Sequence, residues 1–132
     1  MMVDTNVFIA FERRGRAIDL SAWEPSEEVF ISAVTVSELL MGVHRADNEA
    51  RRSRRSAFVE AIISRIPAVA FTAEVARVHA GIYADLARRG QLIGAHDLII
   101  AATAIHHRLS ILTDNREEFS RVPGLTVIPF TL

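Results

Sequence analysis

Short apolar runs of strand length alternate along the chain with longer segments that have a helical period. The apolar runs fall at 1–4, 28–34, 68–71, 109–113 and 125–130. Strands that alternate with helices form a parallel sheet with helices on both faces. The pattern therefore predicts a three-layer α/β domain with a parallel sheet of about four to five strands. Pro129 suits an edge strand, because proline cannot donate a hydrogen bond to a ladder.

Several of the helical segments carry their own start and stop signals. Pro67 ends one helix, whereas Thr72 and Gly90 bracket the next as its N-cap and its C′ residue. The segment 95–107 is apolar nearly all round, which predicts a central helix buried on most sides. The expected helices run through Phe8 and Phe11 and over 35–46, 49–66, 72–89, 95–107 and 115–119.

The composition is that of one globular domain covering residues 1–132. Hydrophobic residues make up 50% of the chain and charged residues 23%, which is too apolar for a disordered chain. No repeat or linker divides the sequence. The chain has no cysteine and no apolar run near the roughly 20 residues of a membrane span. We expect no signal peptide before Asp4. We therefore expect a soluble cytoplasmic protein without a membrane partner.

The charge pattern excludes several classes of function. The net charge is −1, so the protein as a whole is not an electrostatic binder of nucleic acid. All 15 basic residues are arginine, which excludes a catalytic lysine and a lysine-containing phosphate loop. The run RRSRR at 51–55 has two interpretations. Either its arginines bind RNA phosphates, or they form a solvated helix face paired with nearby glutamates, which is the favoured interpretation.

Four acidic residues stand at the ends of predicted strands or at the starts of the helices that follow. In chain order they are Asp4, Glu38, Asp97 and Asp114. The carboxyl ends of parallel strands meet along one edge of the sheet, where ligands bind. We therefore expect these four carboxylates to converge at that edge.

Each of these acids also has a purely structural interpretation. Asp4 alone would serve as an N-cap or Asx turn, and Asp97 as a charge at the N-terminal dipole of its helix. Glu38 closes a capping box that starts at Thr35, and the pair 114–115 is typical of a turn. Four unpaired acids on one edge would repel each other, so the set as a whole favours a functional cluster.

A cation must hold such a cluster together, and the chain contains no lysine to do so. Carboxylates without cysteine select hard divalent ions, Mg²⁺ or Mn²⁺, which keep water and bind phosphate oxygens. Metal ions held in this way activate water and clamp the phosphate in phosphodiester hydrolysis. The sequence therefore predicts a metal-dependent nuclease, in which a metal ion neutralises the buried Asp4. The five histidines lack a metal-ligand spacing, and only His96 beside Asp97 is kept as a candidate.

Three segments carry a resemblance to a known family. MVDTNVFI (2–9), ISAVTVSELLMGV (31–43) and above all GAHDLIIAATAIHHRLSILTDNREEFSRVPGLTV (94–127) resemble a PIN-domain ribonuclease of the VapC toxin type. The likeness covers nearly the whole chain and is weakest in the arginine-rich helix. It implies an Mg²⁺- or Mn²⁺-dependent endoribonuclease that acts as the toxin of a toxin–antitoxin pair. It also implies a homodimer of toxins, which forms a larger complex with an antitoxin that blocks the active site.

The resemblance also assigns places in the site. Asp4, Glu38 and Asp97 match the family's three core acidic positions, and Asp4 and Asp97 are the expected metal ligands. The fourth place departs from the family pattern, because the strict match in the segment 113–115 falls on the neutral Asn115. Asp114 or Glu118 is then expected to supply the charge. The predicted catalytic set is Asp4, Glu38, Asp97 and Asp114, with support from Thr5, Asn6, Asn115 and Glu118.

Two other functions remain open from the sequence. One is a PIN-fold nuclease that processes RNA without an antitoxin, and the other is a non-catalytic PIN-fold partner of a DNA-binding regulator. A non-catalytic protein has no reason to keep buried carboxylates that repel each other, which favours the nuclease. An adjacent reading frame for a DNA-binding antitoxin would distinguish a toxin from a housekeeping nuclease.

Overall fold

The computed structural model describes residues 1–26 and 28–132. In this part of the chain five short strands all run parallel: β1 (Met2–Val3), β2 (Ile31–Ser32), β3 (Ala68–Val69), β4 (Ile111–Thr113) and β5 (Val127–Pro129). Hydrogen bonds of 2.9 Å from Val3 N to Phe30 O and from Phe30 N to Met1 O join β1 to the chain entering β2. The order across the joined sheet is β3-β2-β1-β4-β5, so Pro129 lies on an edge strand, as predicted.

This strand order places a topological switch point between β1 and β4. From β1 the chain builds β2 and β3 on one side, and it then returns to build β4 and β5 on the other. The segments that leave the carboxyl ends of β1 and β4 therefore lead to opposite sides of the sheet. In open α/β sheets the crevice at such a switch point is where ligands bind.

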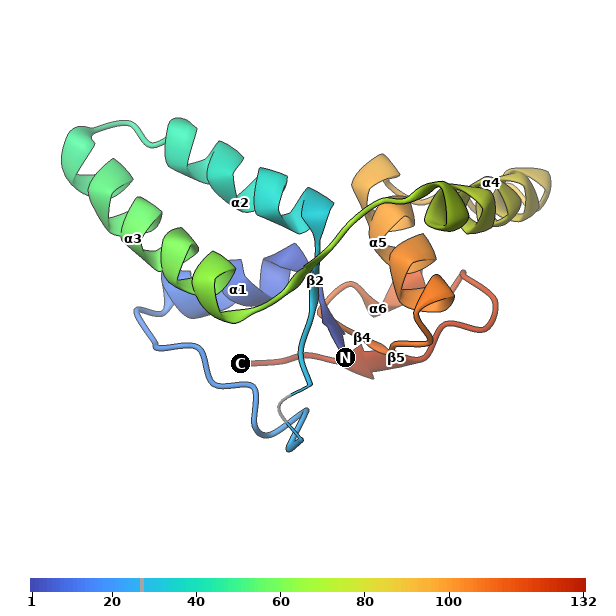
Figure 1. The fold of residues 1–132 in the computed structure, drawn as a ribbon, viewed down its shortest axis with the longest axis horizontal. Helices are drawn as coiled ribbons and strands as arrows, with labels where there is room; N and C mark the ends of the chain where they lie inside the picture. Colours follow the sequence, from blue (N-terminus) through green and yellow to red (C-terminus); the bar gives the residue numbers. More distant parts are fainter. Residues whose placement is uncertain (27) are drawn as a thin grey trace.

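Six helices connect the strands of the described residues (Figure 1). They are α1 (Thr5–Arg13), α2 (Ala33–His44), α3 (Glu49–Arg65), α4 (Ala73–Arg88), α5 (Ala95–His106) and α6 (Arg116–Phe119). Figure 1 shows α2 and α3 as one helical hairpin on the left and α4 and α5 as a second one on the right. Thr72 caps α4 by accepting a hydrogen bond from Val75 N, and Gly90 follows α4 with a φ of +64°, both as predicted.

Alternation of side chains along the strands divides the apolar core between the two faces of the sheet. Val3 and Leu112 pack in one cluster with side chains of α1, α2 and α3. Met2 and Ile111 pack in a second cluster with side chains of α4, α5 and α6. All four of these strand residues are fully buried. The three-layer α/β arrangement predicted from the sequence is therefore confirmed.

The strands are shorter than the apolar runs that predicted them. Of the run 28–34 only Ile31–Ser32 is a strand, and Ala33 already begins α2. Ser32 is the N-cap of α2, and its side chain accepts a hydrogen bond from Val34 N at 3.2 Å. The prediction that this helix begins at residue 35 is therefore wrong by two residues, because a serine at the end of the strand caps the helix first.

Three of the four arginines in the run 51–55 are paired with acids at the surface of α3. Arg51 reaches Asp47 at 2.9 Å, and Arg52 reaches Glu49 at 2.6 Å. Arg55 reaches Glu12 of α1 at 2.9 Å. The predicted pairing with glutamates is therefore confirmed for Arg52 and Arg55, whereas Arg51 pairs with an aspartate.

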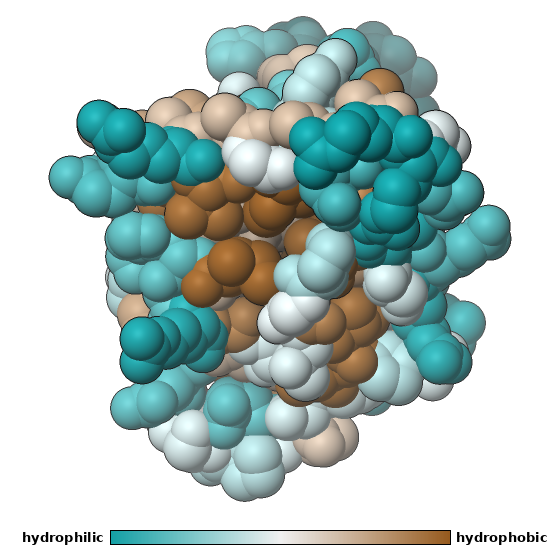
Figure 2. Space-filling model, turned by 90° about the vertical axis from the view of Figure 1, so that its right-hand side faces the viewer, coloured by the Kyte–Doolittle hydropathy of each residue, from teal (hydrophilic) through white to brown (hydrophobic). Residues whose placement is uncertain are grey.

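On the side of the molecule that carries α4 and α5, apolar side chains gather at the centre of the surface and polar side chains surround them (Figure 2). The helix α4 and the loop after it also contribute the exposed side chains of Tyr83 and Leu92. Contiguous apolar surface of this kind is typical of protein contact sites. No helix of residues 1–26 and 28–132 is long and apolar enough to cross a bilayer.

Candidate active site

Asp4 lies at the carboxyl end of β1, at the switch point, and is only 3% exposed. Its backbone N donates to Leu112 O at 3.0 Å, which ties it to β4. Although Asp4 is the N-cap residue of α1, its side chain makes no capping hydrogen bond. Its Oδ2 accepts instead from the Thr113 hydroxyl at 2.7 Å. The interpretation of the Asp4 side chain as a helix cap is therefore wrong.

Burial dominates the electrostatics of Asp4. It raises the pKa of this carboxyl from 3.8 to about 6. Hydrogen bonds from the Thr113 hydroxyl and the Thr5 backbone lower the pKa, whereas the charges of Asp114 and Glu38 raise it further. None of the ion pairs within the described residues involves Asp4. A buried carboxylate without a cationic partner is costly. Asp4 therefore lacks the partner that its burial requires.

Thr113 is a site residue to which the sequence analysis gives no role. It ends β4, is fully buried, and its hydroxyl donates to Asp4 Oδ2 while it accepts from the backbone N of Asn115 at 2.9 Å. The hydroxyl therefore holds Asp4 against the turn that follows β4. The signal in the sequence is a threonine at the last position of an apolar strand, directly before the acidic turn.

Glu38 approaches the site from the second turn of α2. Thr5 Oγ1 lies 2.8 Å from Glu38 Oε1 and 3.1 Å from the hydroxyl of the buried Thr35. A hydroxyl carries one proton and the carboxylate is the stronger acceptor, so Thr5 donates to Glu38 and accepts from Thr35. His96 Nδ1 of α5 lies 3.4 Å from the other carboxylate oxygen, Oε2. Side chains from α1 and α5 thus hold both oxygens of Glu38.

These contacts exclude the capping-box interpretation of Glu38. The N-cap of α2 is Ser32, so Thr35 lies inside the helix and its hydroxyl contacts Thr5. The predicted position of Glu38 in the first turn of its helix is also wrong, since the helix starts earlier than expected. Its carboxylate faces neighbouring elements of the site rather than the start of its own helix.

Asp97 lies in the first turn of α5 and is partly buried. Burial raises the pKa of its carboxyl from 3.8 to about 7, and the charges of Asp4, Glu118 and Glu38 and a hydrogen bond with Glu118 raise it as well. A helix N-terminus favours the charged form of an acid and acts in the opposite direction. Burial and the repulsion of three neighbouring acids therefore oppose the effect of the helix dipole at Asp97.

The segment after β4 contributes two acids in different positions. Asp114 is exposed, and its charge acts on Asp4. Glu118 of α6 contacts Asp97, and Asn115 Nδ2 donates to Glu118 Oε2 at 3.1 Å. Of the candidates for the fourth acid, Glu118 therefore contacts the cluster directly and Asp114 lies at its margin. Asn6, in the first turn of α1, is exposed.

The donor chemistry of this cluster suits a hard divalent ion, which binds carboxylate oxygens. In the part of the chain that the structure describes, no three acidic or histidine side chains form a complete metal centre. Mg²⁺ is usually held by only one or two carboxylates and keeps several waters. Asp4 and Asp97 repel each other and have raised pKa values. These two carboxyl groups therefore fit an ion that takes two of its ligands from the protein.

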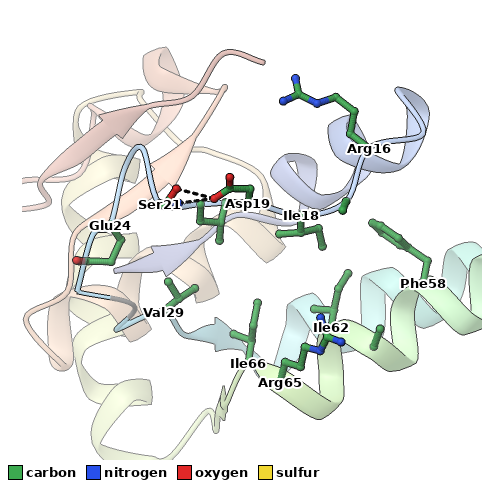
Figure 3. Close-up of a pocket in the computed structure, with 13 residues that line it drawn as sticks. Arg16, Ile18, Asp19, Ser21, Glu24, Val29, Phe58, Ile62, Arg65 and Ile66 are labelled. Carbon is green, nitrogen blue, oxygen red and sulfur yellow. Dashed lines mark hydrogen bonds between the residues drawn. The ribbon is translucent and has the colours of Figure 1, made fainter.

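Two hollows lie beside α3. The larger has a volume of about 460 Å³ and lies between α3 and the segment that follows α1 (Figure 3). Apolar side chains such as Ile18, Phe58 and Ile62 line it, together with some charged ones, and none of the predicted site residues is among them. The smaller has a volume of about 320 Å³, lies between α1, α2 and α3, and is lined in part by Glu38. Only the smaller of these two hollows adjoins the acidic cluster.

Comparison with known proteins identifies the family. The family model of the PIN domain matches residues 1–125. Ribonuclease VapC1 of Rickettsia felis is 38% identical over 97% of this chain and 94% of its own length. DNA-bound VapBC from Salmonella typhimurium superposes with a TM-score of 0.86 at 29% identity, covering 97% of this chain and 96% of that one. VapBC-5 of Mycobacterium tuberculosis, a member of the VapBC family of toxin-antitoxin systems, superposes with a TM-score of 0.79 at 26% identity, covering 98% and 97%. The chain therefore belongs to the PIN-domain family, and within that family to the VapC ribonucleases.

Proposed function

We propose that the chain is a divalent-metal-dependent endoribonuclease and the toxin of a toxin–antitoxin pair. The observation that carries the proposal is the meeting of Asp4, Glu38 and Asp97, from three distant elements, at the switch point of the sheet. The charge of Glu38 raises the pKa of both Asp4 and Asp97, and the charge of Asp4 raises that of Asp97, so a cation is needed to hold all three ionised. The substrate class follows from the ribonuclease relative.

Asp4 and Asp97 are the residues that would hold Mg²⁺ or Mn²⁺. When bound, the ion lowers the pKa of water and neutralises charge that develops on the scissile phosphate. Thr113 keeps one oxygen of Asp4 in a fixed direction through its hydrogen bond of 2.7 Å. Burial of Asp4 excludes water from that side of the site, which strengthens its interaction with a cation.

Glu38 is suited to orient the attacking water and to accept its proton. Thr5 and His96 fix its two oxygens, at 2.8 and 3.4 Å, so the carboxylate loses little freedom when it acts. Glu118 takes the fourth acidic place in this proposal, because Asn115 orients it and it contacts Asp97. Asp114 then contributes only charge at the edge of the site.

The proposed protein partner is an antitoxin that blocks the active site. The structural likeness to a member of a toxin-antitoxin family supports this partner. The apolar surface on the side of α4 and α5 supports a further protein contact, and we propose a homodimer of toxins. Growth arrest on expression, relieved by co-expression of a DNA-binding protein from an adjacent reading frame, would distinguish a toxin from an RNA-processing nuclease.

Cleavage of RNA by the purified protein tests the nuclease. Total RNA is incubated with the protein in Mg²⁺, in EDTA, and in EDTA followed by excess Mn²⁺. We expect fragments in Mg²⁺, none in EDTA, and recovery with Mn²⁺. Asp97→Asn should reduce the rate by about 100-fold or more, whereas Asp85→Asn, at a partly exposed acid paired with Arg89, should cleave at the normal rate. Full cleavage in EDTA would contradict the metal-dependent mechanism.

A further inference from the structure

We propose that Thr35 is a positioning residue of the nuclease site, which acts on Glu38 through the hydroxyl of Thr5. The inference rests on the proposed nuclease function and adds a residue to the groups that carry it out. Thr35 lies in the first turn of α2, one turn before Glu38, and is fully buried. Since Ser32 caps this helix, the Thr35 hydroxyl is not a cap. A buried hydroxyl in this position therefore requires a hydrogen-bond partner elsewhere.

A second buried threonine, Thr103, shows the usual arrangement inside a helix. It is also fully buried, and its Oγ1 donates at 2.7 Å to Ile99 O, four residues earlier in α5. Threonines inside helices commonly bond back to the preceding turn in this way. The Thr35 hydroxyl contacts instead the hydroxyl of Thr5 in α1, at 3.1 Å. The Thr35 side chain thus joins two helices of the site rather than two turns of its own helix.

The direction of these hydrogen bonds follows from the number of protons. Thr5 has one hydroxyl proton and two acceptors within reach, Thr35 Oγ1 at 3.1 Å and Glu38 Oε1 at 2.8 Å. The shorter distance and the negative charge favour the carboxylate. The buried Thr35 hydroxyl then satisfies its own proton by donating to Thr5 Oγ1. The three side chains form a chain of hydrogen bonds from Thr35 through Thr5 to Glu38.

This chain of hydrogen bonds fixes the Glu38 carboxylate from the side of α1. A hydroxyl rotates about its C–O bond, so a donor from Thr35 that occupies one lone pair of Thr5 directs the Thr5 proton toward Glu38. Hydrogen bonds in series also polarise one another, which strengthens the last contact. Thr5 is only 4% exposed, so water competes little for its oxygen. Thr35 therefore restricts the direction in which Glu38 presents its oxygens to the attacking water.

Two variants separate the hydroxyl of Thr35 from its packing. Thr35→Val keeps the shape of the side chain and removes the hydroxyl, whereas Thr35→Ser keeps the hydroxyl and removes the methyl group. Multiple-turnover cleavage of a short labelled RNA in Mg²⁺ gives kcat and KM for each variant. Thr35→Val should lower kcat by about 5- to 10-fold at an unchanged KM, an effect on the order of one net hydrogen bond, and Thr35→Ser should cleave at nearly the normal rate. Thr103→Val, which removes a buried hydroxyl that bonds within its own helix, is the matched control and should leave kcat unchanged.

Two further measurements trace the effect to Glu38. In the Glu38→Gln background, Thr35→Val should lower kcat by about 2-fold or less, because the charged end of the hydrogen-bonded chain is already removed. The rise in Tm on addition of Mn²⁺, measured without RNA, should be the same in Thr35→Val and in the unmodified protein, since the chain ends at Glu38 rather than at the proposed metal ligands. A smaller rise would indicate a general distortion of the site and would overturn the positioning role.

The kinetic comparison also has outcomes that refute the inference. Unchanged kcat in Thr35→Val, an equal loss in Thr103→Val, or a loss in Thr35→Ser as large as that in Thr35→Val would each overturn it. Should Thr35→Val fail to fold, Thr35→Ala against Thr35→Ser makes the same comparison, because these two side chains differ only in the hydroxyl. Cleavage by the unmodified protein separates the two proposals. Its absence refutes the nuclease, whereas its presence with unchanged kcat in Thr35→Val refutes only the role of Thr35.

Discussion

Asp97→Asn is expected to stabilise the metal-free protein at neutral pH while it abolishes cleavage. Burial and the charges of Asp4, Glu118 and Glu38 raise the pKa of Asp97 from 3.8 to about 7. A carboxyl whose pKa rises on folding favours the folded state when protonated and opposes it when ionised. This contribution to stability is fully present below pH 3.8 and is lost as the pH rises through about 7. Asparagine remains uncharged at every pH and avoids that loss.

The magnitude follows from the pKa. One pKa unit corresponds to about 1.4 kcal/mol, so a rise from 3.8 to about 7 limits the destabilisation at neutral pH to about 4 kcal/mol. Solvent at the partly exposed side chain screens part of this repulsion, and the other acids remain in place. We therefore expect Asp97→Asn to gain about 1–2 kcal/mol, or roughly 3–10 °C in Tm.

Thermal unfolding followed by circular dichroism in EDTA measures this gain at pH 7.5 and at pH 4. At pH 4 the carboxyl of the folded protein is protonated, so most of the difference should disappear. Asp85→Asn is the matched control, and it should be neutral or slightly destabilising, because it removes a largely solvent-exposed ion pair with Arg89. A lower Tm for Asp97→Asn at pH 7.5 would refute the reasoning and assign Asp97 to the helix dipole.

Three further predictions follow from the site. The metal-free protein should become less stable to urea as the pH rises from about 4 to about 7, because Asp4 and Asp97 ionise in the folded state only near pH 6 and 7. An increase in the free energy of unfolding over that pH range would contradict the assigned pKa directions. Glu38→Gln should fold normally and cleave RNA about 100-fold or more slowly. Ser32→Ala, which removes the N-cap of α2, should lose about 1 kcal/mol of stability and keep its activity. Equal cleavage rates for the two variants would remove Glu38 from the catalytic set. Thr113→Val should lower the cleavage rate and shift the pH dependence of that rate to higher pH, because Asp4 loses a hydrogen bond that lowers its pKa. An unchanged pH dependence would show that Thr113 contributes only packing.

The sequence is informative about Asp4 and Asp97 because both interrupt apolar segments. A charge in such a place needs a reason, and the parallel order of the strands brings their carboxyl ends to one edge. The convergence of these two acids with Glu38 was predicted from that order alone. Thr72 and Gly90 were predicted equally well, because capping depends on local chemistry that the sequence displays directly.

Other features of the site depend on competition that a single sequence does not resolve. Ser32 and Thr35 are both acceptable N-caps for α2, and only the place where β2 ends selects Ser32. The segment after β4 also offers two competing residues, because Asp114 and Glu118, four residues apart, are both candidates for the fourth acid. Because α6 begins at Arg116, Glu118 turns toward Asp97 while Asp114 stays in solvent. Neither outcome has a signature in residue spacing.

The distribution of arginines explains why the cluster stays available to a cation. In the part of the chain that the structure describes, every arginine ion pair is made with an acid outside the predicted catalytic set, as Arg55 with Glu12 and Arg89 with Asp85. Among the described residues, the one basic side chain paired with the set is His96, whose Nδ1 lies 3.4 Å from Glu38 Oε2. A fixed guanidinium beside Asp4 would neutralise its charge, but it would occupy the oxygens that the proposed ion would bind. Among the described residues, the chain thus leaves its most deeply buried acid without an ion-pair partner, and the ion of the proposed function would recover that cost in stability.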